Sequence, residues 1–251
     1  MGDIKDIEIW GGRLRKLITN LKMKNLSILL LLLCGISPRS QTLSVKGIQK
    51  YCEYDKYDSR QRNLTVTQND SLIIKNVKTE FGEFEISGLK AGFYTFQYTN
   101  IFGQAVRKEI LVSLNKNPII ICVDKFQENN EKTLFSEITK DDKVTINYSS
   151  TGCFSFVSEM MEFSYEGRNL IGKLYIEHKL RKTQKLRSES LEYLIDFEKK
   201  VRQMKNNLGG CTNTDLYVFQ LNGKTEFSID DSSCDWDGYM RLRKKLFNYK
   251  K

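Results

Sequence analysis

Histidine is nearly absent from this sequence: His178 is the single one among 251 residues. One imidazole excludes any metal site that needs two, including the zinc-binding helix with the pattern HExxH. No glycine-rich loop opens a helix to cradle phosphate, and no nucleophile-elbow glycines lie near His178. The sequence therefore assigns no catalytic, cofactor-binding or metal-binding residue and implies no cofactor.

A strong excess of charge is also missing. The formal net charge is +9, but seven of the 40 Lys/Arg and three of the 31 Asp/Glu lie in residues 1–42, so the rest of the chain carries +5. That value is an ordinary solubility charge with a mild preference for anions. It gives no support to a nucleic-acid partner, and we expect none.

No apolar run reaches the roughly 20 residues that a membrane-spanning helix needs. Leu26 to Ile36 is an apolar run of eleven residues, which follows Met23-Lys24-Asn25 and precedes a small, polar stretch. A buried core helix is one interpretation, but this order is typical of a secretory signal peptide. We expect a signal peptide over residues 23–41 and a secreted, periplasmic or cell-surface protein. Residues 1–22, which precede a usable start, are interpreted as a mis-called leader.

Cys34 closes the apolar run and raises lipoprotein anchoring as an alternative. A bacterial lipobox places small residues before its cysteine, whereas Leu32 and Leu33 are large. We therefore favour cleavage near Ser40, although Pro38 is not ideal at its position.

Residues 43–125 are rich in short strands separated by turns. Apolar and polar residues alternate there with period two, which is typical of half-buried antiparallel strands. The expected strands are 43–47, 64–67, 72–77, two within 79–98, 106–114 and 119–123, the last buried on both faces. About seven strands at this spacing predict an antiparallel β-sandwich.

The stretch from Thr79 to Tyr98, TEFGEFEISGLKAGFYTFQY, contains two of these strands joined by glycines. It resembles the G-x-F-x-I-x-G-L and P-G-x-Y pattern of carboxypeptidase-regulatory-like and transthyretin-like domains. Ala91 replaces the usual proline, and Phe81 replaces a polar turn residue. The resemblance implies a β-sandwich and no chemistry. The matching residues are Gly82, Phe84, Ile86, Gly88, Leu89, Gly92 and Tyr94.

The C-terminal half predicts a smaller α+β unit over residues 143–251, after a polar linker at residues 126–142. Its order is strands, helix, hairpin and helix, so the fold class is mainly β with α+β. Ser188 is expected to cap the first helix, which Gly209-Gly210 ends. The last helix runs from about Asp237 to Asn248. The buried stripe of the first helix is Leu191, Leu194, Phe197, Val201, Met204 and Leu208.

Two charged stretches were weighed as sites. The basic stretch from His178 to Arg187 is either a phosphate-binding loop or a solvated connection, and we favour the connection. The acidic stretch 230–238 resembles part of a calcium loop, but Ser233 and Lys244 occupy positions that need acidic ligands. Asp235 or Asp237 capping the last helix explains the acidic stretch better.

Export makes disulfides expected, and five cysteines remain beyond Cys34. Asn222-Gly223 predicts a two-residue hairpin in which Leu221 faces Lys224. Extending this register places Cys211 opposite Cys234 and puts Leu216, Val218, Phe227 and Ile229 on the core face. Cys52 and Cys122, near the two ends of the sandwich, form the second expected pair. Cys153 is left over, although its pairing with Cys211 or Cys234 is a rival.

These observations predict an exported bacterial cell-envelope protein that acts as a non-enzymatic binding or interaction module. Its partner would be a protein or a glycan of the envelope. One alternative is an envelope hydrolase whose carboxylates lie in the C-terminal unit, since any two acids can converge. Another is an inhibitor or immunity-type protein that uses the basic face.

Overall fold

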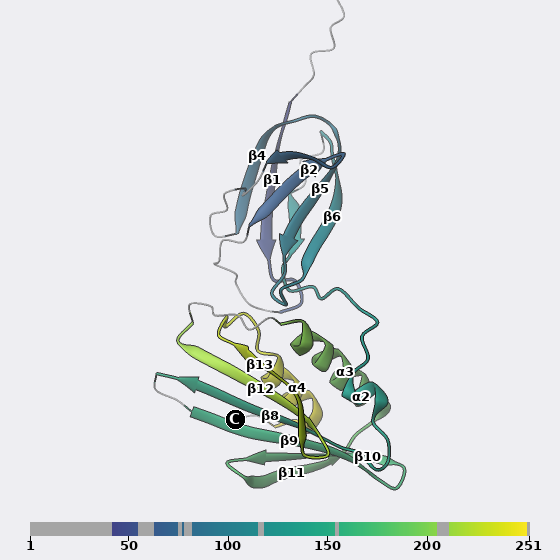
Figure 1. The fold of residues 1–251 in the computed structure, drawn as a ribbon. Coiled ribbons are helices and arrows are strands. Elements are labelled where there is room, and N and C mark those ends of the chain that lie inside the picture. The colour runs from purple at the N-terminus through teal and green to yellow at the C-terminus, as the bar shows by residue number, and fades with distance from the viewer. Residues whose placement is uncertain are drawn as a thin grey trace, which may run out of the picture. The chain divides into compact units, whose positions relative to one another are not determined.

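The computed structural model describes residues 42–54, 63–74, 77, 82–114, 118–153, 156–204 and 211–249 (Figure 1). The expected leader, signal peptide and Cys34 lie outside these residues. Leu43–Lys251 forms one compact unit. Within the described part of the chain, no helix has the length and apolar character that a membrane span requires.

The first part of this unit is the expected β-sandwich. One sheet has the order β4-β1-β7 and the other the order β3-β2-β5-β6. All pairs are antiparallel except β1 with β7, which run parallel. The strands are β1 (Leu43–Lys50), β2 (Leu64–Gln68), β3 (Ser71–Ile74), β4 (Glu83–Leu89), β5 (Gly92–Thr99), β6 (Ala105–Val112) and β7 (Ile119–Cys122).

The glycine-bracketed connection between β4 and β5 crosses from one sheet to the other. Gly88 and Gly92 have φ values of +82° and +153°, a region that residues with a Cβ rarely adopt. The alternating apolar residues of both strands then point inward. The Phe84 and Phe96 rings lie 6.3 Å apart between centroids. This segment therefore forms the centre of the sandwich core rather than a hairpin.

The expectation that residues 119–123 are buried on both faces is wrong. Ile121 is fully buried, but Ile120 is 41% exposed. β7 is an edge strand of its three-stranded sheet, so its residues alternate between core and solvent even though all are apolar.

The second part of the unit is α+β, as expected. Its six-stranded sheet has the order β11-β10-β9-β8-β12-β13, and all of its pairs are antiparallel. Helix aromatics contact the sheet: Phe135 packs edge-on against Phe163, and Phe197 stacks on Phe219. The elements are α2 (Leu134–Glu137), β8 (Lys143–Gly152), β9 (Phe156–Glu166), β10 (Asn169–Ile176), β11 (Lys179–Lys185), α3 (Ser188–Gln203), β12 (Asn213–Leu221), β13 (Lys224–Asp231) and α4 (Gly238–Phe247).

Helix α3 buries the expected stripe but begins differently. Leu194, Phe197, Val201 and Met204 are buried, whereas Leu208 and Gly209-Gly210 lie outside the described residues. The N-cap residue is Arg187 without a side-chain cap bond, so the prediction that Ser188 caps the helix is wrong. Burial of the apolar stripe, rather than a cap, accounts for this helix.

Helix α4 also begins without a side-chain cap. Asp237 occupies the N-cap position, but its carboxylate accepts a hydrogen bond from Arg241 Nε at 2.6 Å instead of one from the backbone. Asp235 accepts a hydrogen bond from the Tyr51 hydroxyl at 3.0 Å. The capping prediction is thus wrong for both aspartates. Gly238 follows because a Cβ there would collide with the Trp236 ring.

The Asn222-Gly223 hairpin is present, with Leu221 opposite Lys224. A bulge between Phe219 and Gln220 then shifts the register, so Phe219 faces Phe227. Tyr217 and Phe219 are fully buried, and Leu216 and Val218 are only partly covered. The predicted core face of β12 is therefore wrong, because Phe197 of α3 packs on Tyr217 and Phe219. The bulge, whose extra residue lies in β13, brings Phe227 onto the same face, where it stacks on Phe219.

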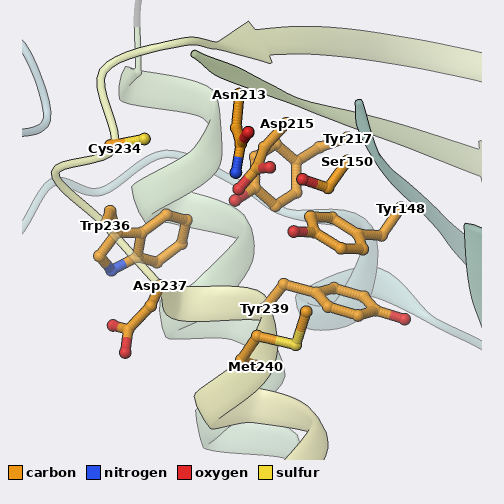
Figure 2. Close-up of a pocket in the computed structure, with 10 residues that line it drawn as sticks. All are labelled: Tyr148, Ser150, Asn213, Asp215, Tyr217, Cys234, Trp236, Asp237, Tyr239 and Met240. Carbon is orange, nitrogen blue, oxygen red and sulfur yellow. The ribbon is translucent and has the colours of Figure 1, made fainter. Parts of the chain in front are cut away.

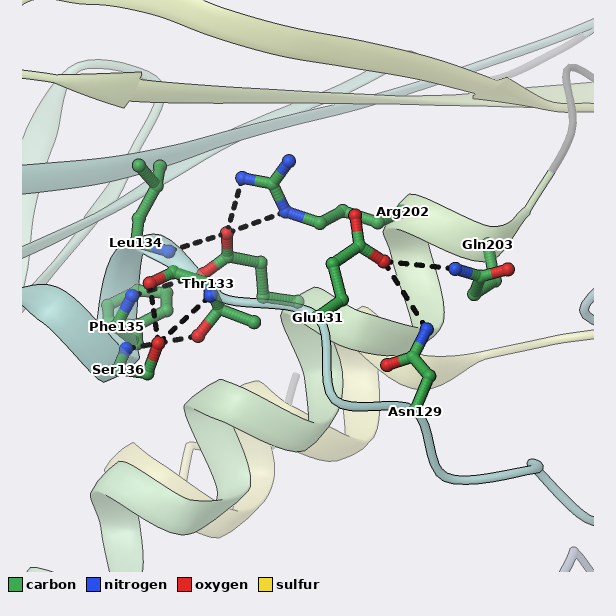
Figure 3. A network of polar contacts seen from close by, with 9 residues as sticks. Asn129, Glu131, Thr133, Leu134, Phe135, Ser136, Arg202 and Gln203 are labelled. Atoms are coloured by element: carbon green, nitrogen blue, oxygen red, sulfur yellow. Dashed lines mark hydrogen bonds and ion pairs between the residues drawn. The ribbon is translucent and has the colours of Figure 1, made fainter.

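Residues 126–142, the expected linker, contain α2, which is bonded to α3 (Figure 3). The buried Glu198 carboxylate accepts hydrogen bonds from the Leu134 and Phe135 backbone N–H groups at 2.8 and 3.1 Å. These are two of the N–H groups that a helix start leaves without partners. Arg202 donates two further bonds to Glu198, at 2.9 and 2.7 Å. Glu198 thereby ties the end of the expected linker to α3.

Two disulfides are present among the described residues, and they join the pairs expected from the sequence. Cys52 is bonded to Cys122 in the sandwich, with 5.4 Å between Cα atoms. Cys211 is bonded to Cys234, with 5.9 Å between Cα atoms, beyond the ends of β12 and β13. Cys153 is a free, exposed cysteine.

The basic stretch from His178 to Arg187 is neither a phosphate loop nor a plain connection. Most of it forms β11, an edge strand of the six-stranded sheet. His178 is exposed in the preceding turn, with φ of +63°. Lysines and a bulge on an edge strand discourage pairing with another chain.

Candidate functional site

A pocket of about 380 Å³ lies where β8 and β12 meet the segment that leads into α4 (Figure 2). Its walls combine aromatic rings with hydroxyl, amide and carboxylate groups. No lysine or arginine is among the described residues that line it. The lining residues are Tyr148, Ser150, Asn213, Asp215, Tyr217, Cys234, Trp236, Asp237, Tyr239 and Met240.

The sheet provides one wall of the pocket, because alternate residues of a strand point to the same face. Tyr148 and Ser150 are alternate residues of β8, so both face the pocket. Their direct partners on β12 are Tyr217 and Asp215, respectively. The ladder register therefore brings these four side chains into two adjacent rows on one face of the sheet.

The segment after β13 provides the opposite wall and is held by several bonds. The Cys211–Cys234 disulfide ties it to the start of β12. Within it, the Ser233 N–H donates to Asp231 at 2.9 Å, and the Asp235 N–H donates to Ser233 Oγ at 3.1 Å. These bonds fix the path of the chain on both sides of Cys234.

The Trp236 indole is wedged among other rings. It stacks on Phe197 at 5.3 Å between centroids and meets Phe102 edge-on at 5.7 Å. Its Nε1–H donates to the Tyr54 hydroxyl at 3.2 Å. Trp236 is therefore a rigid part of the pocket wall.

Tyr217 carries an unsatisfied polar group in the pocket wall. The residue is fully buried, and its hydroxyl, like that of Tyr239, has no hydrogen-bond partner among the described residues. Burial, followed by the charge of Asp215, raises its pKa well above the ordinary value. The group is therefore a neutral hydroxyl that can donate one hydrogen bond and accept others.

Asp215 has an acidic neighbour on one side and two hydroxyl groups on the other. Its direct partner on β13 is Asp231, and like charges directly opposite each other on a sheet destabilise it. Burial raises the pKa of the Asp215 carboxyl, and the charge of Asp231 adds to this. Hydrogen bonding to Ser150 and Tyr148 acts in the other direction. The carboxyl is therefore protonated more readily than a free aspartate.

Tyr148 and Tyr239 form the floor of the pocket. Their rings stack with centroids 4.0 Å apart, and Figure 2 shows the two hydroxyls pointing in opposite directions. The Tyr148 hydroxyl is directed towards Asp215, whereas the Tyr239 hydroxyl points the other way, near the buried Glu159, and makes no hydrogen bond with the described residues. Burial raises the pKa of both tyrosines, so both stay neutral at physiological pH.

Asp237 forms part of the rim. Its side chain is 53% exposed and is paired with Arg241, four residues later on α4. Arg241 in turn lies over the Tyr54 ring, 4.4 Å from its centroid. The charge of Asp237 is thus balanced within the protein, in contrast to that of Asp215.

A second pocket, of about 430 Å³, is lined by residues of the other parity on β8 and β12. Asn147 and Ser149 on β8 and Leu216 and Val218 on β12 contribute to it, as does His178. None of the described residues forms a group of three His, Cys, Asp or Glu side chains that could hold a metal ion.

The sequence-predicted disulfide Cys211–Cys234 borders the first pocket, since Cys234 is one of its lining residues. Cys52–Cys122 lies in the sandwich and contributes to neither pocket. Sequence reasoning missed Asp215 and Tyr217, because nothing in the pattern shows which face of β12 meets which residues of β8. The compact run Asp235-Trp236-Asp237-Gly238 is the one sequence signal that points to this pocket.

No family model and no curated protein matches this chain. Among solved structures, it is similar to BcpA, the major pilin subunit of Bacillus cereus. The two are 12% identical with a TM-score of 0.33, over 76% of this chain and 67% of the pilin chain. A likeness at this level does not identify the chain.

Proposed function

We propose that this protein is an exported, non-enzymatic binding module of the bacterial cell envelope. In this proposal the pocket between β8, β12 and the start of α4 holds a polar group that is carried by a protein or glycan partner. The six-stranded sheet and the Cys211–Cys234 disulfide serve to keep the pocket in shape.

The observation that carries the proposal is the Tyr217 hydroxyl. A buried polar group without a hydrogen bond costs folding free energy, so native proteins seldom keep one. Here the group belongs to a residue of the pocket wall, beside the half-buried carboxyl of Asp215. A ligand that bonds to Tyr217 would supply the missing partner. Phenylalanine at this position would fill the same space without that cost.

Export is supported by the cysteine chemistry. The described residues form two disulfides. Disulfides persist in oxidising compartments and are rare in the cytosol. Cys52–Cys122 joins residues 70 positions apart in the sequence, and Cys211–Cys234 joins the ends of β12 and β13. Such cross-links stabilise a protein outside the cytoplasm. A location outside the cytoplasm therefore agrees with the signal peptide expected over residues 23–41.

We also propose that the sandwich is of the carboxypeptidase-regulatory-like type. The residues that carry this resemblance serve as core or turn positions: Phe84, Ile86, Leu89 and Tyr94 are buried. The Tyr94 hydroxyl donates to the Lys90 carbonyl at 3.0 Å and accepts from its N–H at 3.1 Å. In this proposal the sandwich is a spacer or docking domain and has no chemistry of its own.

Retention of envelope material on the immobilised protein tests the binding function. The full chain is immobilised, and protein and glycan fractions of an envelope extract are passed over it. We expect one fraction to contain material that the wild type retains and Tyr217→Phe does not. Tyr239→Phe is the matched control, because it removes a buried hydroxyl that points away from the pocket. Equal retention by wild type and Tyr217→Phe would contradict the proposal.

A hydrolase is the second candidate, and one observation favours it. Asp215 and Asp237 line the same pocket, and burial raises the pKa of Asp215. Glycosidases use one protonated and one ionised carboxyl in this way. A panel of envelope polysaccharides would decide: product release by the wild type that Asp215→Asn abolishes would establish the hydrolase.

A further inference from the structure

The pocket contains a carboxyl group, that of Asp215, which has no cationic neighbour in the described part of the chain. The interactions that shift the pKa of Asp215 come from burial, Ser150, Tyr148 and Asp231, and none of these is positive. Asp237, the other carboxylate of the pocket, is already paired with Arg241. The chain as a whole carries a net positive charge of +9, so the acidic character of this pocket is local.

The ladder makes this arrangement costly for the folded protein. Asp215 and Asp231 are direct partners on β12 and β13, and Asp231 is itself buried. Like charges at this spacing repel, and the charge of Asp231 adds to the effect of burial on Asp215. A bound cation beside Asp215 would add an attraction to that carboxyl.

The remaining walls suit a cation that also donates hydrogen bonds. The Tyr217 hydroxyl can accept one bond through its free lone pairs, and the Asn213 amide oxygen can accept another. Tyr148, Tyr217 and Trp236 also line the pocket, and aromatic rings attract an ammonium group that lies over their faces.

From these features, and given the binding function proposed above, we infer that the pocket binds a primary ammonium group on a short alkyl chain. Asp215 supplies the counter-charge, and Tyr217 and Asn213 accept its N–H donors. A lysine side chain of a protein partner and a free alkylamine share this chemistry. The pocket volume, about 380 Å³, is within the range of small-ligand sites.

Titration of Trp236 fluorescence tests this inference. The chain has two tryptophans, so Trp10→Phe in the full chain leaves Trp236 as the reporter. The probes are n-butylammonium chloride, with n-butanol and sodium butyrate as neutral and anionic controls of the same length. We expect a saturable change with the ammonium probe alone. Its affinity should fall about tenfold or more in Asp215→Asn, and less in Tyr217→Phe.

The thermal midpoint provides a second readout, because a ligand that binds only the folded state raises it. We expect n-butylammonium to raise the midpoint of the wild type and to leave that of Asp215→Asn unchanged. The midpoint of each variant without probe reports whether it is folded. A lysine-containing peptide and its norleucine counterpart then distinguish a protein source from a free amine.

Two outcomes would overturn the inference. If n-butanol binds as well as n-butylammonium, the pocket does not select a cation, although a binding function for neutral ligands would stand. A ligand that binds in the mM range would saturate the site at about 100 mM. If n-butylammonium changes neither the fluorescence nor the midpoint up to that concentration, no ammonium site exists. Retention of an envelope ligand by the wild type, lost in Tyr217→Phe, would then still support the proposed function.

Discussion

At the scale of single residues, the buried Tyr217 hydroxyl links stability to binding. Removing an unpartnered buried polar atom relieves its desolvation cost, so Tyr217→Phe should leave the free energy of unfolding unchanged or raise it by about 1 kcal/mol. Urea denaturation at pH 7 measures this. A loss of more than about 1 kcal/mol would mean that the hydroxyl has a partner inside the protein.

Asp215 should make stability depend on pH in a predictable direction. Because its pKa is raised in the folded state, the folded chain holds the proton more tightly than the unfolded chain does. Its contribution is therefore fully present below the pKa of the unfolded state and is lost as pH rises through the folded pKa. Relative to Asp215→Asn, the wild type should lose stability from acidic to neutral pH. Parallel curves for the two proteins would contradict this.

Individual contacts of this pocket could not be predicted from the sequence, whereas the cysteine pairs could. The pairing of Cys211 with Cys234 was predicted from the Asn222-Gly223 turn and the length of its arms, which are local properties. It tolerates the one-residue shift of the bulge, because both cysteines lie beyond the ends of β12 and β13. The position of Tyr217 beside Asp215 and Tyr148 depends on the β8–β12 pairing. Those strands are more than 60 residues apart, and no local pattern encodes their register.

At the scale of elements, Glu198 joins α2 to α3. It is fully buried and accepts bonds from two backbone N–H groups and Arg202. Glu198→Gln loses the charge that balances Arg202, and we expect a loss of about 3 kcal/mol in the free energy of unfolding. Chemical denaturation measures it. Glu192→Gln, on the exposed face of the same helix, is the control and should change stability by less than about 0.5 kcal/mol.

A loss below about 1 kcal/mol in Glu198→Gln would show that α2 is held mainly by its apolar contacts. Phe135 is the candidate for that role, since it is buried against Phe163 at 5.2 Å between centroids.

The elements themselves were largely predictable, and their details were not. Period-two alternation and the glycine turns predict the sandwich strands, and the three- to four-residue stripe predicts α3. The bulge between Phe219 and Gln220 was not predictable, because it satisfies the packing of Phe227 on Phe219 rather than any turn preference. One extra residue in β13, Glu226, was enough to place Phe227 on the same face as Phe219 instead of that of Val218.

At the scale of the whole molecule, the division into a sandwich and an α+β domain remains a prediction. Limited proteolysis should cut first within residues 126–142, on the N-terminal side of Thr133, because α2 is held by Glu198. We expect fragments of about 80 and about 110 residues. A single resistant fragment would mean that contacts such as those of Tyr51 with Asp235 and Phe102 with Trp236 unite the two parts.

The disulfides can be checked chemically on the exported protein. Peptide mapping without reduction should yield one fragment linking Cys52 to Cys122 and another linking Cys211 to Cys234. Cys153 should react with an alkylating reagent in the folded protein, because it is free and exposed. A fragment that links Cys153 to Cys211 or Cys234 would contradict the assignment.

The most direct test of the proposed binding function is to map the ligand onto the protein by NMR. Amide and indole N–H shifts are recorded before and after addition of the envelope fraction that the wild type retains. We expect the largest changes at residues 148–150, 213–217 and 234–240, including the Trp236 indole. Changes confined to β11, or to the second pocket around His178, would contradict the assignment of the binding site.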